Sequence, residues 1–374
     1  MASSLPSTQR AIAMTSKRAP LAEISVPVHP PAADEVVVRV AWTASTPLDL
    51  HRADGGLLVA SYPAQAGGGG IAGTVVAVGG SADLVKGLGV GDRVMAFAFR
   101  GGKEANHQEY VTVPAYLVSS VPPGLTLREA CTVPVNLVTV FHAATADLGL
   151  DLPWPLPDTA TTPDDDQDPP IVVWGASSSV GIYALQVLRH WYRHRRLLAV
   201  SSRQHHPLLL RLGATACFDR ADPRVVDAVL ASVGSRHAPL VLDCIGSLDG
   251  SLRPLARIAQ PGSRVAVMLP VIIRDATDDE EPEYEMDVSK CLPGLWADGV
   301  LLRGVRTHFY LQNEFFKEML QPEIVPALLA QGVVEPNRQR VVEGATMLER
   351  AQKALDLLRS RTVSGERLVW QVAP

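Results

Sequence analysis

The stretch that decides the fold is IVVWGASSSVGIYALQVL, residues 171–188. It begins with a short apolar run, as expected of a strand covered on both faces, and ends with apolar residues at helical spacing. Gly175 can form the tight turn between them, and Gly181 can let the helix pack closely on the strand. Small residues between these glycines let a phosphate approach the N–H groups of the helix N-terminus. We therefore predict a nucleotide-binding turn made of Gly175, Ser177, Ser178, Ser179 and Val180.

Strands and helices alternate along the chain after this turn. Further strand-like runs lie at 196–202, 216–219, 239–246 and 263–270, and helical segments of roughly ten residues separate them. This alternation is typical of βαβ units and predicts an α/β fold with a doubly wound parallel sheet, a Rossmann nucleotide-binding domain. The turn is then the first βα turn of the series, where a phosphate site is expected. A purely structural turn is the alternative.

The first 130 residues follow a different pattern. Residues 35–44, 72–80 and 92–99 are short β-branched or alternating runs, punctuated by Gly and Pro. This pattern predicts a compact sheet or barrel. Towards the C-terminus we expect one long helix at 313–332, a second helix at 345–360 and a final strand at 366–373.

Length and composition limit the classes of protein that fit. A chain of 374 residues is longer than one hydrophobic core usually serves, so two domains are expected. The hydrophobic fraction of 47% and the charged fraction of 20% are ordinary for a globular protein. A net charge of −5 provides no basic field for nucleic acid or an anionic membrane. No run approaches the roughly 18 apolar residues of a membrane span.

The N-terminal residues and the cysteines predict a cytoplasmic location. Residues 1–20 lack the apolar core of a signal peptide. The four cysteines lie far apart in the sequence, so we expect free thiols in a reducing compartment. Two acidic segments, 151–170 and 274–290, read as surface insertions.

The end of the second strand of the α/β region selects the cofactor. Enzymes that bind NAD usually carry Asp or Glu there for the ribose 2′-hydroxyl. Here the stretch is AVSSRQHH, residues 199–206, and it contains no acid. Ser201, Ser202 and Arg203 would suit a 2′-phosphate, which arginine binds well. We therefore expect NADP(H), with Arg220 flanking the adenosine end or lying on the surface.

The stretch GGGGIAG, residues 67–73, also has the composition of a phosphate loop. However, it is followed by the extended run TVVAVGG and not by a helix. It therefore has no helix N-terminus to offer a phosphate. We expect these glycines to leave bare backbone that gives a bulky substrate room.

Several motifs together resemble the medium-chain dehydrogenase/reductase superfamily. They are TPLDLHRADG (46–55), GIAGTVVAVG (70–79), GVGDRVMAF (89–97), QEYVTVP (108–114), ACTVPVNLVTVFHA (130–143), WGASSSVG (174–181), VLDCIG (241–246) and VSGERLVW (363–370). The most similar branch is that of the zinc-free quinone oxidoreductases and the fungal trans-acting enoyl reductases. The resemblance implies a GroES-like β-rich catalytic domain formed by residues 1–135 and 309–374. It implies a Rossmann domain at 136–308 that contains the insertion at 151–170.

The resemblance also implies a site without zinc. Zinc-dependent relatives carry a Cys where this chain has Thr46, and a His-Glu pair where it has Gly69 and Gly70. Without a metal to stabilise an alkoxide, the acceptor must need less activation, as a conjugated C=C–C=O or a quinone does. Glu104 and His107 could suggest a stray ligand pair, but a loop histidine is the plainer interpretation.

Site residues carry over from the family motifs position by position. Thr139, His51 and Tyr310 are the catalytic candidates, with Thr139 beside the nicotinamide and Tyr310 as a proton donor. Asn136 is a weaker candidate, and Asp49 is expected to hold the TPLD loop. Thr307 to Tyr310 are expected to lie near the nicotinamide pocket. Besides the phosphate turn and the residues at 201–203 and 220, the implied cofactor contacts are Thr46, Pro47, His51, Thr139, Cys244, Ile245, Leu269, Pro270, Val363 and Ser364.

These features predict an NADPH-dependent, zinc-independent reductase of activated double bonds. A quinone oxidoreductase and a non-catalytic NADPH-binding redox sensor are the alternatives. The substrate would be a small molecule, either free or bound to a carrier protein, and the enzyme a monomer or homodimer. A carrier would need a basic docking patch, for which residues 189–196, RHWYRHRR, are a candidate if they are exposed.

Overall fold

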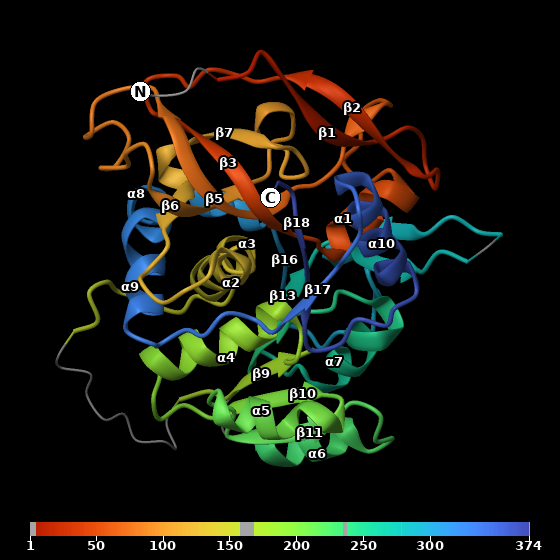
Figure 1. Ribbon diagram of the computed structural model, residues 1–374. Coiled ribbons are helices and arrows are strands. Elements are labelled where there is room, and N and C mark those ends of the chain that lie inside the picture. The colour runs from red at the N-terminus through yellow and green to blue at the C-terminus, as the bar shows by residue number, and fades with distance from the viewer. Residues whose placement is uncertain (1–4, 158–167, 235–237, 278, 374) are drawn as a thin grey trace. The chain divides into compact units, whose positions relative to one another are not determined.

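The computed structural model describes residues 5–157, 168–234, 238–277 and 279–373 (Figure 1). Half of the acidic insertion, residues 158–167, lies outside the described residues. The chain forms two compact units, Met1–Val135 with Leu311–Pro374, and Asn136–Tyr310. We call them unit 1 and unit 2.

Unit 2 is built on a six-stranded sheet whose paired strands are all parallel. Its strands are β9 (Ile171–Trp174), β10 (Leu197–Ser201), β11 (Ala216–Asp219), β12 (Leu240–Asp243), β13 (Arg264–Met268) and β16 (Leu301–Val305). Their order is β11-β10-β9-β12-β13-β16. The chain therefore moves outward from β9 in one direction, then returns to β12 and moves outward in the other. This confirms the doubly wound α/β fold, and its switch point lies between β9 and β12.

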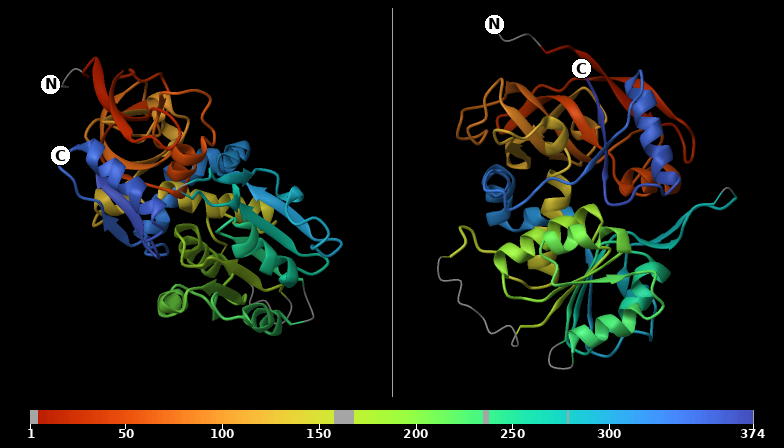
Figure 2. Two further views of the ribbon diagram at one scale, coloured as in Figure 1. Left: turned by 90° about the vertical axis from the view of Figure 1, so that its right-hand side faces the viewer. Right: turned by 60° about the horizontal axis from the view of Figure 1, so that its bottom comes forward.

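Helices cover both faces of this sheet (Figure 2). The helices of unit 2 are α4 (Ser179–Trp191), α5 (His206–Arg211), α6 (Val225–Val233), α7 (Arg253–Ile258) and most of α3 (Pro134–His142). Its shorter turns are η3 (Ala143–Asp147), η4 (Arg203–His205), η5 (Leu248–Leu252), η6 (Val288–Lys290) and most of η7 (Thr307–Gln312). Strand residues such as Val172, Val241 and Val265 are fully buried with helix residues such as Leu255 in one apolar core. Burial on both faces explains why the strands read as continuous apolar runs.

Unit 1 is β-rich, as the sequence predicts. Its larger sheet has the order β17-β18-β3-β5-β6-β8, with β7 also paired to β3, and a smaller sheet has the order β2-β1-β4. The strands are β1 (Thr8–Met14), β2 (Leu21–Pro27), β3 (Glu35–Ala44), β4 (Ala64–Gln65), β5 (Gly69–Val78), β6 (Arg93–Ala98), β7 (Tyr110–Pro114), β8 (Val118–Ser120), β17 (Gln339–Val341) and β18 (Arg367–Gln371). Strand β18 pairs antiparallel with β3, so the C-terminal end of the chain completes a sheet begun near the N-terminus.

The helices of unit 1 differ from expectation at one place. They are α1 (Pro47–Gly55), α2 (Leu127–Ala130), α8 (Glu314–Met319), α9 (Val325–Ala330) and α10 (Met347–Arg359), with the turns η1 (Gly102–Glu104), η2 (Ala115–Leu117) and η8 (Leu320–Ile324). The single long helix expected at 313–332 is divided into α8 and α9 by the π-turn η8. Pro322 lies in that turn and has no N–H to donate, which explains the break in the α-helical hydrogen bonding.

The glycine stretch at 67–73 runs into strand β5, which confirms that it is not a turn leading into a helix. A side chain at Gly70 would collide with the carbonyl oxygen of Cys131, and one at Gly73 with that of Arg39. These two glycines therefore allow close backbone packing. At these two positions main chain already fills the space, so Gly70 and Gly73 do not leave the room for a substrate that was expected of the stretch.

The acidic segment at 274–290 carries a short antiparallel hairpin, β14 (Val271–Arg274) with β15 (Glu283–Glu285). Residue 278 lies outside the described residues. The Arg274 guanidinium lies 3.5 Å from the Glu280 carboxylate and 3.8 Å from that of Glu283. The four cysteines are free thiols. No helix in the described parts of the chain is long and apolar enough to cross a membrane.

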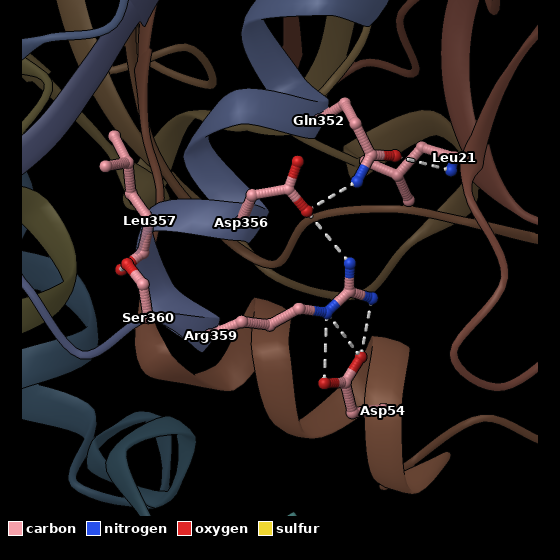
Figure 3. A network of polar contacts seen from close by, with 7 residues as sticks. All are labelled: Leu21, Asp54, Gln352, Asp356, Leu357, Arg359 and Ser360. Carbon is pink, nitrogen blue, oxygen red and sulfur yellow. Dashed lines mark hydrogen bonds and ion pairs between the residues drawn. The ribbon is translucent and has the colours of Figure 1, made fainter. Parts of the chain in front are cut away.

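A polar network ties three elements of unit 1 together (Figure 3). Arg359 on α10 holds the buried Asp54 carboxylate of α1, with Nη2 at 2.7 Å from Oδ1. Arg359 also donates to Asp356 at 3.0 Å, which accepts from Gln352 at 2.9 Å. The side-chain oxygen Oε1 of Gln352 accepts from the backbone N–H of Leu21 on β2 at 2.8 Å. The network fixes α10 against α1 and β2.

We predict that Gly70→Ala lowers the free energy of unfolding by about 2 kcal/mol, because the new methyl group meets rigid backbone. Gly68→Ala is a matched control from the same stretch, since only side chains, of Arg52 and Leu48, lie near its added carbon, at 3.5 and 4.0 Å. Urea unfolding of both variants measures the difference. Equal stabilities would contradict the close-packing account of Gly70.

We also predict that Arg359→Ala destabilises the protein by about 2 kcal/mol, because it leaves a buried carboxylate without its charged partner. The double variant Asp54→Asn/Arg359→Ala should be more stable than Arg359→Ala alone. Lys353→Ala is the control: its ion pair with Glu349 is solvent-exposed and contributes less than about 1 kcal/mol. If urea unfolding shows that Arg359→Ala destabilises the protein no more than Lys353→Ala does, the stabilising role given to the Arg359–Asp54 ion pair is refuted.

Candidate functional site

The turn after β9 has the geometry of a phosphate-binding loop. Gly175 has φ +75°, in the left-handed region that favours glycine. Its N–H and that of Ala176 both point to the carbonyl of Val200 on β10, at 2.9 and 3.0 Å. The Ser178 hydroxyl caps helix α4 by accepting from the N–H of Gly181 at 3.1 Å. These bonds hold the loop in place at the N-terminus of α4.

Gly181 allows α4 to lie directly on the turn. A side chain there would come within 2.6 Å of the Cα of Ala176. The spacing of Gly175 and Gly181 therefore matches the roles predicted for them, turn and close packing. Ser177, Ser179 and Val180 are half-buried around the same turn. Together they form a cradle at the switch point of the sheet.

Strand β12 ends beside this cradle. The buried carboxylate of Asp243 accepts from the N–H groups of Ile245 at 2.9 Å and Gly246 at 3.2 Å, and from the Ser251 hydroxyl at 2.6 Å. Burial raises the pKa of Asp243 to about 6. Ile245 is 43% exposed and its side chain covers Gly175. Asp243 therefore orders this loop. We did not single it out from the sequence. An acidic residue at the end of an apolar strand is the sequence signal that could have identified it.

Neighbouring residues of the same loop region were predicted as cofactor contacts. The Cys244 side chain lies close to Gly175 of the turn, and burial raises the pKa of Cys244. Cys244 is therefore a neutral thiol next to the cradle. Leu269 and Pro270 follow β13, and Leu269 packs over Gly304 of β16. These positions remain predicted contacts.

A polar group forms at the carboxyl ends of β10 and β11. The Arg220 Nε donates to the Ser202 hydroxyl at 3.0 Å, and the Arg220 N–H donates to the carbonyl of Ser201 at 2.9 Å. Ser201 is buried and Arg203 is exposed next to it. The structure thus brings Arg220 to the end of the second strand, where the sequence left its position open.

Thr139 faces Thr307 inside unit 2. The two hydroxyl oxygens are 2.9 Å apart, and either can be the donor. Thr139 is 3% exposed, and Asn136 on the same helix is 6% exposed. The Asn136 side-chain N–H group has no hydrogen-bond partner among the described residues. Tyr310, at the end of the same unit, is 1% exposed.

The remaining predicted positions lie in unit 1. The Thr46 N–H donates to the Asp49 carboxylate at 2.7 Å, which confirms that Asp49 holds the TPLD loop. Pro47 is exposed at the first turn of α1, and His51 is 9% exposed. Val363 is half-buried and Ser364 exposed between α10 and β18. The contacts of these residues with a cofactor stay predictions.

His107 lies in the loop between η1 and β7, as the plainer interpretation expected, and it is buried there. It is 4% exposed, and its ring packs against Trp370 with the centroids 4.8 Å apart. Burial lowers its pKa. Glu104 is engaged by Arg100 at 3.0 Å. Within the described residues, no group of three or more His, Cys, Asp or Glu side chains could hold a metal ion.

Most arginine side chains of the basic stretch at 189–196 make hydrogen bonds or ion pairs inside unit 2. Arg189 donates to the carbonyl of Gly213, and Arg195 is buried in an ion pair with Asp168 at 2.7 Å. Arg196 donates to carbonyls at the end of α6. Only Arg193 and His194 in this stretch are exposed. The stretch is therefore not the continuous basic docking patch for which it was a candidate.

Known proteins resemble both units. The alcohol dehydrogenase GroES-like domain matches residues 32–140. Trans-enoyl reductase opdC of Penicillium oxalicum is 30% identical over 71% of this chain and 72% of its own length. Trans-enoyl reductase himH of Aspergillus japonicus is 29% identical over 91% of this chain and 90% of its own. In fold, the crystal structure of the CurK enoyl reductase matches with a TM-score of 0.72 at 15% identity, covering 98% of this chain and 99% of that one.

These likenesses confirm the family resemblance of the sequence motifs. The relatives match across most of the chain, and the GroES-like match coincides with much of the N-terminal part of unit 1. The chain belongs to the medium-chain dehydrogenase/reductase superfamily, in the branch of the fungal trans-enoyl reductases.

Proposed function

We propose that this protein uses NADPH to reduce an activated carbon–carbon double bond conjugated to a carbonyl group. The observation that carries the choice of cofactor is the Ser202–Arg220 pair at the end of β10. The choice of acceptor is supported by relatives that bear the name trans-enoyl reductase. The acceptor would be a small molecule, either free or carried as a thioester.

The residues of unit 2 fit the phosphates of this cofactor. At the pyrophosphate end, the N-terminus of α4 provides N–H donors and the positive end of a helix dipole. At the adenosine end, the Arg220 guanidinium is oriented by the Ser202 hydroxyl, and the exposed Arg203 follows Ser202 in the chain. A 2′-phosphate would find two guanidinium groups there, which pair well with phosphate oxygens. The unphosphorylated ribose of NADH would offer these two guanidinium groups no anion to bind.

The protein's own part in the reaction is to orient the acceptor and manage its charge and protons. When bound, NADPH supplies the hydride, here to the β-carbon of the acceptor. An enolate results on the acceptor, and its α-carbon then requires a proton. We assign the Thr139 hydroxyl, which Thr307 holds at 2.9 Å, to donate to this enolate. His51 and Tyr310 remain the other catalytic candidates.

We predict that Arg220→Ala weakens NADPH binding about 10- to 100-fold, because a charge-assisted contact with the 2′-phosphate is lost. Binding of NADH should be nearly unchanged, since it has no such phosphate. Arg203→Ala should act in the same direction. Arg193→Ala, an exposed arginine outside this group, is the control, and fluorescence titration gives the dissociation constants. Equal losses for both cofactors would refute the 2′-phosphate assignment.

We predict that the label from the transferable C4 position of deuterated NADPH appears at the β-carbon of an α,β-unsaturated thioester. In D₂O with unlabelled cofactor, deuterium should appear at the α-carbon instead. Mass spectrometry and NMR of the saturated product locate the label. Consumption of NADPH with a quinone, but with no saturated thioester formed, would favour the quinone oxidoreductase alternative. Binding of NADPH without turnover of either acceptor would favour a sensor.

A further inference from the structure

Helix α3 carries a polar stripe through an apolar interior. Asn136, Thr139 and His142 follow one another at intervals of three residues, which places them on one side of the helix. They are 6%, 3% and 8% exposed. The residues between them, Leu137, Val138, Val140 and Phe141, are 0–1% exposed. Burying polar side chains costs free energy, so a buried row of them indicates a functional role.

The turn η7 presents a matching pair to this stripe. Thr307 faces Thr139 with 2.9 Å between the hydroxyl oxygens. His308 follows Thr307 directly, and it is close enough to His142 to influence its titration. Burial and the neighbouring His308 lower the pKa of His142 to about 4. A hydroxyl pair in this arrangement can reverse its donor and acceptor, and a neutral imidazole can accept a proton at one nitrogen and release one from the other.

Asp147, at the end of the turn η3, lies near His142. Its Oδ2 is 3.9 Å from the His142 Nε2, which is longer than a hydrogen bond. This buried oxygen has no hydrogen-bond partner among the described residues. Burial raises the pKa of Asp147 to about 6, against the opposing influence of Arg303 on β16. A histidine with a purely structural role would be expected to bond this neighbour.

We propose that His142 and Asp147 form a proton relay behind the Thr139–Thr307 hydroxyl pair, which returns the proton that the reduced acceptor takes up. They are positioning residues, since they act through Thr139. The proposal rests on the proposed function and adds to it a source for the second hydrogen. The pattern N-x-x-T-x-x-H in a buried helix is the sequence feature that corresponds to it.

The relay balances in atoms and charge. The α-carbon forms a C–H bond with the proton of the Thr139 hydroxyl as that O–H bond breaks. The Thr139 oxygen takes the proton of Thr307. The Thr307 oxygen then takes a proton from the His142 imidazole, which must first close to hydrogen-bond distance from it. The imidazole regains its proton from the Asp147 carboxyl group, which in turn takes a proton from the solvent. The relay moves protons only, because the hydride transfer supplies both electrons of the reduction.

The test compares His142→Gln with the wild-type full chain, using NADPH and an enoyl thioester. Glutamine keeps a polar side chain in the stripe but does not relay protons. We expect kcat to fall about 100-fold, with the dissociation constant for NADPH unchanged. The solvent isotope effect on kcat should rise, and the isotope effect from deuterated NADPH should shrink, because protonation becomes slower than hydride transfer. If the role of His142 were purely structural, the substitution would not raise the solvent isotope effect while it reduces the isotope effect from deuterated NADPH.

Two further variants complete the test. Asp147→Asn, which is nearly isosteric, should lower kcat with the same change in isotope effects even if His142→Gln fails to fold. His190→Gln, on α4 of the same unit, is the control and should keep wild-type kcat. Wild-type isotope effects in Asp147→Asn, or in a folded His142→Gln, would overturn the relay alone. A wild-type enzyme that transfers no hydride to the thioester would overturn the proposed function as well.

Discussion

The tight turn at Gly175 is the constraint on which the rest of unit 2 depends. Its left-handed backbone lets β9 turn directly into α4, and Gly181 lets that helix settle on the turn. Because β9 is central in the sheet, with β10 on one side and β12 on the other, the turn also sets the switch point. The ends of β10 and β12 then bring Ser202 and Ile245 to opposite sides of one cradle.

Much of this could be predicted from the sequence because the signals are local. Apolar runs of four or five residues mark strands buried on both faces. Elsewhere, β3 and β11 begin and end where the sequence pattern predicted them. The phosphate turn is readable because glycine spacing, small residues and the following helix occur together. The partner of Arg220 could not be read, since the hydrogen bond to Ser202 joins two parallel strands whose register is set by tertiary packing.

The errors arose where a residue's role depends on distant backbone. Composition made Gly70 look like open space, but the carbonyl of Cys131, brought close by the fold, occupies it. The arginines at 189–196 looked like a surface patch, but carbonyls and Asp168 use most of their donors. Asp147 went unnoticed because its burial, which raises its pKa, has no signature in the neighbouring sequence. Asp243 could have been noticed as the acid that ends an apolar strand. Spacing alone could have shown His142, three residues beyond Thr139.

A crystal structure of the protein with NADPH would test the account most directly, because it shows both ends of the cofactor at once. We expect the pyrophosphate oxygens to accept hydrogen bonds from N–H groups at the start of α4, just after Gly175. We expect the 2′-phosphate to contact the Arg220 guanidinium and the Ser202 hydroxyl. A cofactor bound elsewhere, or one whose 2′-phosphate lies away from both residues, would contradict the central claim.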